Sequence, residues 1–501
     1  MKLSFITSQL YGKYDVTGDG DPDITGVTAD SRRVRPGRVF VALKGSKQDG
    51  RAFIAEAVEK GAVAVVTDSA LDAKPEGIPV IKVENAAATL GRIADVLYAK
   101  PSFGMKVVGT TGTNGKTTVT FLVHHLMKCA LGRAGMISTP GYDDGERVWQ
   151  SSRTTPASNE IHALMAVMKD NDCRGVAMEV SSHGLEQMRV ASVRFDVGVF
   201  TNLTRDHLDY HGSMEAYFQA KARLPLILAE QRATGGKEGV FVVNTDDIHG
   251  QLLARDFASR VRILSYGFGA GADLRATRPR LAADGSRFAL TVKGREILVQ
   301  IPLIGRFNIY NAMAALGAAA SIGLNFREAV RNLADAPQIP GRMQSVTDRA
   351  PFRVFVDYAH TPDALENALD TLRELKPARL ITVFGCGGER DRMKRPQMGR
   401  CASERSDIVL VTSDNPRGEN PAAILKEIEG GISRRNYRVI EDRAEAIRVA
   451  IETARENDLV LIAGKGHETT QEIAGEKHPF DDVAVAREAL RQLPPERGGG
   501  S

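Results

Sequence analysis

The sequence predicts an α/β protein of three domains built around mostly parallel sheets. Three observations support this fold class. At 501 residues the chain exceeds what one hydrophobic core usually serves. Short apolar, β-branched runs alternate along it with longer helical runs. Most of these apolar runs end in glycine or charged residues, as strands do where ligands bind at the carboxyl edge of a parallel sheet.

Composition is that of an ordinary soluble protein, with 43% hydrophobic and 26% charged residues. A formal net charge of +4 is small for this length, so neither nucleic-acid binding nor a polybasic membrane anchor is expected. No apolar run approaches the roughly 20 residues of a membrane span, and residues 1–5 lack an apolar signal core. Four scattered cysteines without a C-x-x-C pair argue against zinc or disulfides and favour a reducing cytoplasm.

Residues 1–100 predict a small N-terminal α/β domain. Apolar residues 37–43 and 61–67 predict buried strands, and residues 50–58 between them predict a helical segment. The segment Asp30-Ser31-Arg32 places polar groups beside the first strand. These groups suit either a ligand site or a plain capping turn, and spacing alone does not separate the two.

The central domain, residues 101–338, opens with a phosphate-binding pattern. A β-branched strand runs into a glycine-rich loop, and Lys116 begins an apolar-periodic run that predicts a helix. Strand, glycine loop and helix in this order cradle polyphosphate on backbone N–H groups, with Thr117 on Mg²⁺. The match is not strict, because Thr110 stands where the motif has its first glycine, and the alternative is a glycine-rich turn with a solvent lysine. The sequence therefore predicts a P-loop-type sheet with a nucleotide site at Gly112, Thr113, Asn114, Gly115, Lys116, Thr117 and Thr118.

Two later strands of this domain also end in polar groups. Glu179 closes the apolar run 175–178, where a carboxylate beside a phosphate loop is well placed as a metal ligand. The run 195–203 leads into a segment with two histidines and two aspartates. That segment suits either a solvated loop with capping aspartates or a second Mg²⁺ site in which His207 is a ligand.

Lys221 lies on a predicted helix, on the face that includes Tyr217 and Leu224. A lysine on such a half-apolar face is usually a snorkelling surface residue.

Further along, residues 272–302 alternate as short strands and predict an antiparallel patch. Asn308 precedes an alanine-rich helix, where it could be the N-cap or could bind a nucleotide base.

Residues 339–495 predict a C-terminal, Rossmann-like domain. Four apolar strands, each followed by glycine or charge, alternate with helices and predict an open parallel sheet with ligands at its carboxyl edge. The strands cover residues 354–357, 380–384, 408–412 and 459–463. Residues 496–501 read as a flexible tail.

Taken together, these motifs resemble the Mur ligases, ATP-dependent amide-forming enzymes of peptidoglycan precursor synthesis. The resemblance covers almost the whole chain. Residues 30–50 resemble the uridine-binding domain of the branch that adds the third peptide residue, and Asp414-Asn415-Pro416-Arg417 resembles the motif of members that add meso-2,6-diaminopimelate. The matching segments are 109–118, 179–185, 201–212, 308–311, 357–362 and 464–468.

The resemblance implies roles for individual residues. ATP would contact the phosphate loop together with Asn308, Arg342 and Asp357. Two Mg²⁺ ions would be held by Thr117, Glu179, His207 and Lys221, the last as a CO2-derived carbamate, and Lys116, Lys221, His207 and Glu179 would form the catalytic set. The UDP-MurNAc-dipeptide would contact Ala29, Ser31, Ser46, Lys47, Gln48, Arg153, Thr154, Thr155, Ser181, Gln187 and Arg189. Diaminopimelate would contact Arg390, Asp414, Asn415, Pro416, Arg417, Gly464 and Glu468.

Arg153 departs from the family, which has asparagine there. The expected partners are these small molecules, with no nucleic acid and no membrane insertion, and a cytoplasmic monomer is expected. The rival enzyme class is folylpolyglutamate synthetase, which shares the ATPase core but has no use for a uridine-binding domain or for the Asp414–Arg417 motif. The rival outside enzymes is a P-loop switch, which needs fewer charged sheet edges than this sequence has.

Overall fold

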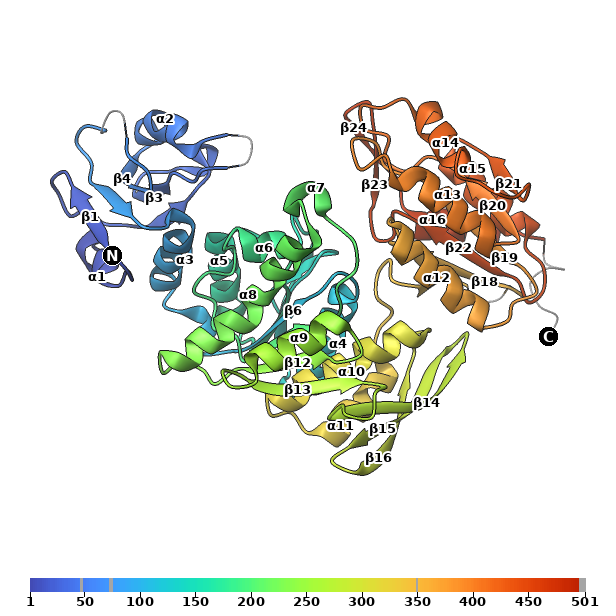
Figure 1. The fold of residues 1–501 in the computed structure, drawn as a ribbon. Helices are drawn as coiled ribbons and strands as arrows, with labels where there is room; N and C mark the ends of the chain where they lie inside the picture. The colour runs from blue at the N-terminus through green and yellow to red at the C-terminus, as the bar shows by residue number, and fades with distance from the viewer. Residues whose placement is uncertain (46–47, 72–74, 348–349, 495–501) are drawn as a thin grey trace.

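The computed structural model describes residues 1–45, 48–71, 75–347 and 350–494. Three α/β bodies follow one another along the chain, and the central body stands between the other two (Figure 1). The predicted tail lies outside the described residues. None of the helices within the described ranges combines the length and apolar content that a membrane crossing requires.

The N-terminal body contains one mixed sheet in the order β1-β5-β4-β3-β2. Valines and alanines alternate between its faces, so that α1 and α3 cover one face and α2 the other. Its strands are β1 (Tyr14–Thr17), β2 (Gly26–Thr28), β3 (Arg38–Val41), β4 (Ala62–Thr67) and β5 (Val80–Val83). Its helices are α1 (Leu3–Ser8), η1 (Ser31–Arg33), η2 (Gly50–Phe53), α2 (Ile54–Glu59) and α3 (Ala86–Leu97).

The central body is a long sheet in the order β16-β15-β14-β13-β12-β11-β6-β10-β7-β8-β9. Its middle strands, from β14 to β7, pair in parallel, and the pairs at the two ends, β14–β15–β16 and β7–β8–β9, are antiparallel. The strands are β6 (Lys106–Thr111), β7 (Ala134–Ile137), β8 (Tyr142–Asp143), β9 (Val148–Trp149), β10 (Gly175–Glu179), β11 (Val197–Phe200), β12 (Val240–Asn244), β13 (Arg262–Gly267), β14 (Leu274–Ala282), β15 (Gly285–Val292) and β16 (Arg295–Ile301).

Helices cover both faces of this sheet. On β12, Val240 and Val242 pack toward α4 and α10, while Phe241 and Val243 pack toward α5, α8 and α9. The helices are η3 (Pro101–Phe103), α4 (Lys116–Leu131), α5 (Ser158–Asp170), α6 (Ser182–Glu186), α7 (Leu208–His211), α8 (Met214–Ala233), α9 (Ile248–Phe257), α10 (Arg306–Ser321), α11 (Phe326–Asn332) and η4 (Leu333–Asp335).

The C-terminal body is a sheet in the order β17-β18-β22-β19-β20-β21, parallel except for β17. Helices α12 to α14 cover one face and α15 with α16 the other. The strands are β17 (Gln344–Ser345), β18 (Arg353–Asp357), β19 (Leu380–Phe384), β20 (Ile408–Val411), β21 (Tyr437–Val439), β22 (Leu459–Ala463) and the hairpin β23 (Thr470–Ile473) and β24 (Glu476–Pro479). The helices are α12 (Pro362–Glu374), α13 (Lys394–Arg405), α14 (Pro421–Glu429), α15 (Arg443–Thr453) and α16 (Asp482–Arg491).

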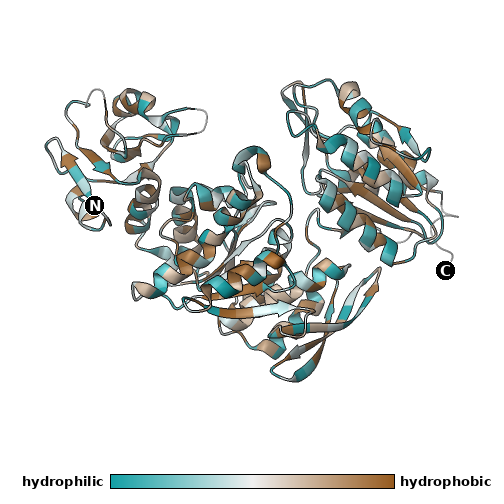
Figure 2. Cartoon of the chain, in the orientation of Figure 1, coloured by the Kyte–Doolittle hydropathy of each residue, from teal (hydrophilic) through white to brown (hydrophobic). Residues whose placement is uncertain are grey.

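The predicted α/β class is confirmed, with apolar strands inside each body and polar helix faces outside (Figure 2). The predicted antiparallel patch is β14 to β16, and the four predicted C-terminal strands are β18, β19, β20 and β22. Two C-terminal edge strands, β17 and β21, were not predicted. Both are only two or three residues long and partly exposed, so neither carries an apolar run.

Candidate active site

The phosphate loop connects β6 to α4 as the sequence predicts. Gly112 has a φ of +147°, and a Cβ there would lie 1.8 Å from Thr201 Oγ1. Gly115 has a φ of +87° and is the N-cap of α4, which starts at Lys116. The Lys116 ammonium donates to the carbonyls of Gly112 and Thr113, at 3.0 and 2.7 Å, so it is folded back over the loop and not extended into solvent.

Glu179 ends β10, the strand next to the phosphate loop, and is 1% exposed. Its Oε1 accepts hydrogen bonds from the hydroxyls of Thr117 (3.0 Å) and Ser138 (2.5 Å) and from the Thr139 N–H (2.8 Å). The carboxylate thus lies beside the hydroxyl of the first helical turn, at the carboxyl end of the parallel strands. A buried carboxylate needs hydrogen-bond donors, and these three donors to Glu179 are all neutral.

Lys221 is 1% exposed in α8, so the alternative of a snorkelling surface lysine is wrong. Its Nζ donates to the Gly112 carbonyl at 2.7 Å, the same oxygen that Lys116 contacts. It also lies 4.4 Å from the centre of the Tyr217 ring. Burial, reinforced by the charge of Lys116, lowers the pKa of Lys221 well below that of an ordinary lysine. Burial also lowers the pKa of Lys116.

His207 belongs to a cluster of aromatic rings that includes His183, Tyr210, His211 and Tyr217. The His207 ring lies 4.9 Å from that of His183, edge to face. Burial lowers the pKa of His207, and burial with repulsion from the neighbouring imidazoles lowers the pKa of His183 to about 4. These rings are therefore neutral at pH 7, the form in which histidine binds metals.

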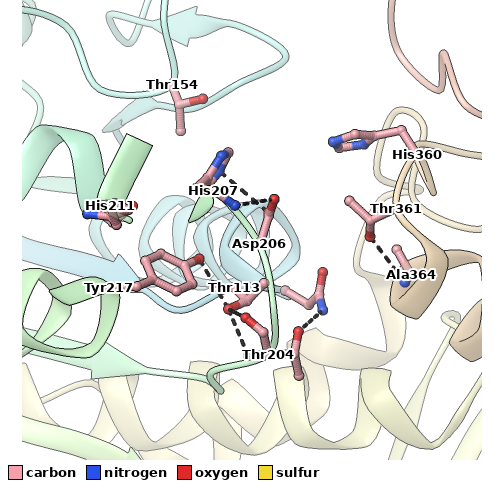
Figure 3. A network of polar contacts seen from close by, with 12 residues as sticks. Thr113, Thr154, Thr204, Asp206, His207, His211, Tyr217, His360, Thr361 and Ala364 are labelled. Atoms are coloured by element: carbon pink, nitrogen blue, oxygen red, sulfur yellow. Dashed lines mark hydrogen bonds and ion pairs between the residues drawn. The ribbon is translucent and has the colours of Figure 1, made fainter. Parts of the chain in front are cut away.

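The central and C-terminal bodies meet at this site. Figure 3 shows Asp206 and His207 facing His360 and Thr361, which precede α12 of the C-terminal body. Asp363, in the first turn of α12, accepts hydrogen bonds from Asn114 Nδ2 and Thr204 Oγ1, both at 3.0 Å. Sequence reasoning missed Asp363, because an acidic residue in a first helical turn is ordinary and its partners lie far away in the chain.

Of the three further residues expected to contact ATP, Arg342 reaches the phosphate loop, while Asp357 and Asn308 are hydrogen-bonded to nearby backbone groups. Arg342 Nη2 donates to Thr117 Oγ1 at 3.1 Å, so the start of the C-terminal body reaches the phosphate loop. Asp357 is capped by the N–H groups of Met343 and Ala359, and burial raises the pKa of its carboxyl. The capping role for Asn308 is wrong. The N-cap of α10 is Gly305, and the Asn308 amide is buried within the helix and donates to the Ile304 carbonyl.

Residues expected at the UDP-MurNAc-dipeptide surround the strand end of Glu179. The Thr155 hydroxyl donates to the Glu179 carbonyl at 2.9 Å, and Arg189 donates to the Thr155 carbonyl and to Gln187 Oε1. Thr154, Ser181 and the exposed Arg153 lie in the same region. The Thr154 hydroxyl accepts a hydrogen bond from Thr139, and Ser181 is the N-cap of α6. Burial lowers the pKa of Arg189, and the positive charge of Arg153 lowers it further.

The remaining residues of that set are on the N-terminal body. Asp30 caps η1 by accepting the Arg32 N–H at 3.0 Å, so the predicted capping turn is present, with Ser31 buried beside it and Ala29 before it. Arg33 forms an ion pair with Glu160 of α5, and α3 packs on α5, so this body is joined to the central one. Gln48 is described, but Ser46 and Lys47 lie outside the described residues.

The residues expected at diaminopimelate gather at the carboxyl edge of the C-terminal sheet. Asn415 Nδ2 donates to Glu468 Oε2 at 2.7 Å. Gly464 has a φ of +120° and lies against Asp414, because a Cβ there would be 2.6 Å from Asp414 Oδ2. Arg417 donates to the Gly388 carbonyl at 2.6 Å and lies 3.6 Å from Glu472 of β23. Pro416 lies within this loop, and Arg390, on the facing loop after β19, is exposed.

Three protein-family models match successive segments of this chain. The Mur ligase family catalytic domain matches residues 23–98, the Mur ligase middle domain residues 110–319, and the Mur ligase glutamate ligase domain residues 341–466.

Relatives match over nearly their full length. The chain is 43% identical to a UDP-N-acetylmuramoyl-L-alanyl-D-glutamate–2,6-diaminopimelate ligase of Geobacter metallireducens, over 94% of this chain and 95% of the relative. It is 41% identical to the protein of that name from Geobacillus thermodenitrificans, over 98% of this chain and 100% of the relative. A solved structure of that name has a TM-score of 0.67 at 34% identity, over 93% of this chain and 95% of that one.

The fold is also similar to that of a Mycobacterium tuberculosis folylpolyglutamate synthase complexed with ADP and AMPPCP, with a TM-score of 0.60. The two sequences are 20% identical, and the match covers 80% of this chain and 94% of the synthase chain. At that identity the likeness shows a shared fold alone. The full-length matches at higher identity decide between the two classes. The chain therefore belongs to the Mur ligase family and is an ATP-dependent, amide-bond-forming ligase.

Proposed function

We propose that this Mur ligase joins meso-2,6-diaminopimelate to the D-glutamate carboxylate of UDP-N-acetylmuramoyl-L-alanyl-D-glutamate, using ATP, in cytoplasmic peptidoglycan precursor synthesis. The proposal rests on the names of its relatives and on one structural observation. Asp414, Arg417 and Glu468 gather at one sheet edge, so both signs of charge are available to a zwitterionic amino acid. Residues 1–100 would bind the uridine nucleotide, residues 101–338 ATP, and residues 339–495 the amino acid. The protein would act as a monomer.

The donor set beside the phosphate loop fits Mg²⁺. Thr117 and Glu179 offer a hydroxyl and a carboxylate 3.0 Å apart, and hard oxygens are the ligands that Mg²⁺ prefers. Within the described residues, no group of three or more His, Cys, Asp or Glu side chains is arranged to hold a metal ion. Thr117 and Glu179 alone would not satisfy a Mg²⁺ ion, so ATP and water would supply the remaining oxygen ligands. When bound, Mg²⁺ would reduce the repulsion between the triphosphate and the glutamate carboxylate.

Lys221 is suited to carbamylation. An amine reacts with CO2 only when it is neutral, and the lowered pKa of Lys221 gives it a larger neutral fraction than an ordinary lysine has. Carbamylation would replace the buried Lys221 amine beside Lys116 with an anion. That anion and the neutral His207 would be ligands for a second Mg²⁺.

The chain's own residues would then align the reactants. The phosphate loop and Lys116 would hold the triphosphate, while Thr155 and Arg189 would hold the nucleotide substrate near Glu179. The carboxylate attacks the γ-phosphorus, and ADP leaves with the electrons of the broken P–O bond. The amine of diaminopimelate attacks the resulting acyl phosphate, a tetrahedral intermediate forms, and phosphate leaves as the amide forms and the amine loses a proton. Because the amino-acid site is on another body, closure of the C-terminal body would assemble the reaction. Gly305 and Gly341 would lie near the hinge.

Phosphate release is the direct test. With purified protein, ATP and Mg²⁺, release should require both the UDP-MurNAc-dipeptide and meso-diaminopimelate. Release with a folate and glutamate would support the folylpolyglutamate class instead, and release that needs no second substrate would support a switch ATPase.

A further inference from the structure

A fully buried lysine lies behind the proposed amino-acid site. Lys465 follows β22 in the loop that carries Gly464 and Glu468, and its side chain is 0% exposed. Its Nζ donates to Asn415 Oδ1 at 2.9 Å, to Glu468 Oε2 at 3.1 Å and to the Thr470 carbonyl at 2.7 Å. An ammonium group has three N–H donors, so all of them are engaged. Lys465 therefore has no donor left with which to bind a ligand.

These contacts fix the orientation of the Asn415 amide. Its Oδ1 accepts from Lys465 and also from the Glu472 N–H, at 3.0 Å. Since two donors point at that oxygen, the amide nitrogen must face the other way, and it donates to Glu468 Oε2 at 2.7 Å. A flipped amide would place its oxygen against a carboxylate oxygen, which is repulsive.

Glu468 is consequently held by one oxygen only. Oε2 accepts from both Lys465 and Asn415, while Oε1 accepts no hydrogen bond from the described residues, and the side chain is 31% exposed. The carboxylate is thus fixed with one acceptor available. An ammonium group is the ligand chemistry that such an acceptor suits.

We infer that Lys465 is a positioning residue for amino-acid binding. It acts through Asn415 and Glu468, holding the Glu468 carboxylate oriented for the distal ammonium of diaminopimelate, and it does not touch the substrate itself. This inference rests on the proposed function, because it assumes that the zwitterionic end of the amino acid binds beside Glu468.

The test is steady-state kinetics of Lys465→Met in the full chain. Removing a charge-assisted network that orients one ligand contact should raise the KM for meso-diaminopimelate about 10- to 100-fold. The KM values for ATP and the UDP-MurNAc-dipeptide should stay within about twofold, because their expected contacts lie on other elements. Arg379→Met is the matched control. It removes a cation that pairs with the buried Asp458 at the opposite edge of the same sheet, so it should lower the unfolding temperature without changing the KM for diaminopimelate.

A double-variant cycle tests whether Lys465 acts through Glu468. Lys465→Met combined with Glu468→Gln should be no weaker for diaminopimelate than Glu468→Gln alone, because interacting residues are not additive. Fully additive effects would overturn the inference, as would an unchanged KM in Lys465→Met.

If Lys465→Met does not fold, the variant Asn415→Asp tests the same inference. It keeps the size of the side chain and an acceptor for Lys465, but turns a second oxygen toward Glu468 Oε2, so the same selective rise in KM is expected. An unchanged KM for diaminopimelate, or equal rises for all three substrates, would overturn the inference. Failure of the wild type to use diaminopimelate would instead refute the proposed function.

Discussion

At the scale of single residues, Lys221 is a buried lysine that shares the Gly112 carbonyl with Lys116. Its place on a helical face with Tyr217 could be read from the spacing of the chain. Its burial could not, because the contact with the Gly112 carbonyl joins residues far apart in sequence. Lys116, Thr117 and Glu179 were easier to predict, since each lies at a strand or helix end that parallel topology brings to one edge. Asp363 and Lys465 depend on tertiary docking alone and have no local signature.

Lys221→Ala should leave the fold intact and lower kcat by roughly 10²- to 10³-fold or more, because an anion that would hold a metal ion is lost. A second readout is ¹³C NMR in ¹³C-bicarbonate, where the wild type should show a carbamate signal that Lys221→Ala lacks. Lys237→Ala is the control. It removes another partly buried lysine, paired with Asp196, and should lower stability while keeping the signal and kcat. Wild-type activity of Lys221→Ala at limiting bicarbonate would refute the proposed carbamate.

At the scale of elements, the strongly apolar strands and the phosphate loop were predictable, because their patterns are local. Helix starts were less so. Helix α10 begins at Arg306, so its N-cap is Gly305, with a φ of +98°, and Asn308 lies inside the first turn. Short edge strands such as β21 form by pairing with a neighbour and not by apolar pattern, so the sequence alone did not predict them.

The loop between β6 and α4 should not tolerate a side chain at Gly112. Gly112→Ala combines a positive φ with a Cβ 1.8 Å from Thr201 Oγ1, so we expect a loss of about 2 kcal/mol or more in unfolding free energy and a strong loss of ATP binding. Gly104→Ala is the control, since Gly104 has a φ of −87° and open space around its Cβ. Urea unfolding and nucleotide titration measure both effects. Equal stability and ATP affinity of the two variants would contradict the loop geometry.

At the scale of the whole molecule, the proposed reaction would require the three bodies to bring separate substrates together. Asp363 connects the C-terminal body to the phosphate loop through Asn114 and Thr204. Asp363→Ala should therefore loosen the nucleotide-free arrangement and increase the radius of gyration in small-angle X-ray scattering. Asp370→Ala, on the same helix but paired with Arg405 within the C-terminal body, should leave it unchanged. An identical radius of gyration for the wild type and Asp363→Ala would show that these two bonds do not hold the bodies together.

The choice of amino acid tests the proposed function most directly. Diaminopimelate is lysine with a second carboxylate at its far end, and under the proposed function the Arg417 guanidinium would offer a two-point fork for that anion. When L-lysine binds instead, the Arg417 guanidinium has no substrate carboxylate to pair with. That loss would cost roughly 2–5 kcal/mol, or about 30- to 4,000-fold in kcat/KM. The decisive measurement is kcat/KM for meso-diaminopimelate and L-lysine in the wild type and in Arg417→Ala. We expect the wild type to prefer diaminopimelate by that factor and Arg417→Ala to lose the preference while retaining ATP binding, whereas equal use of L-lysine by the wild type would contradict the proposed function.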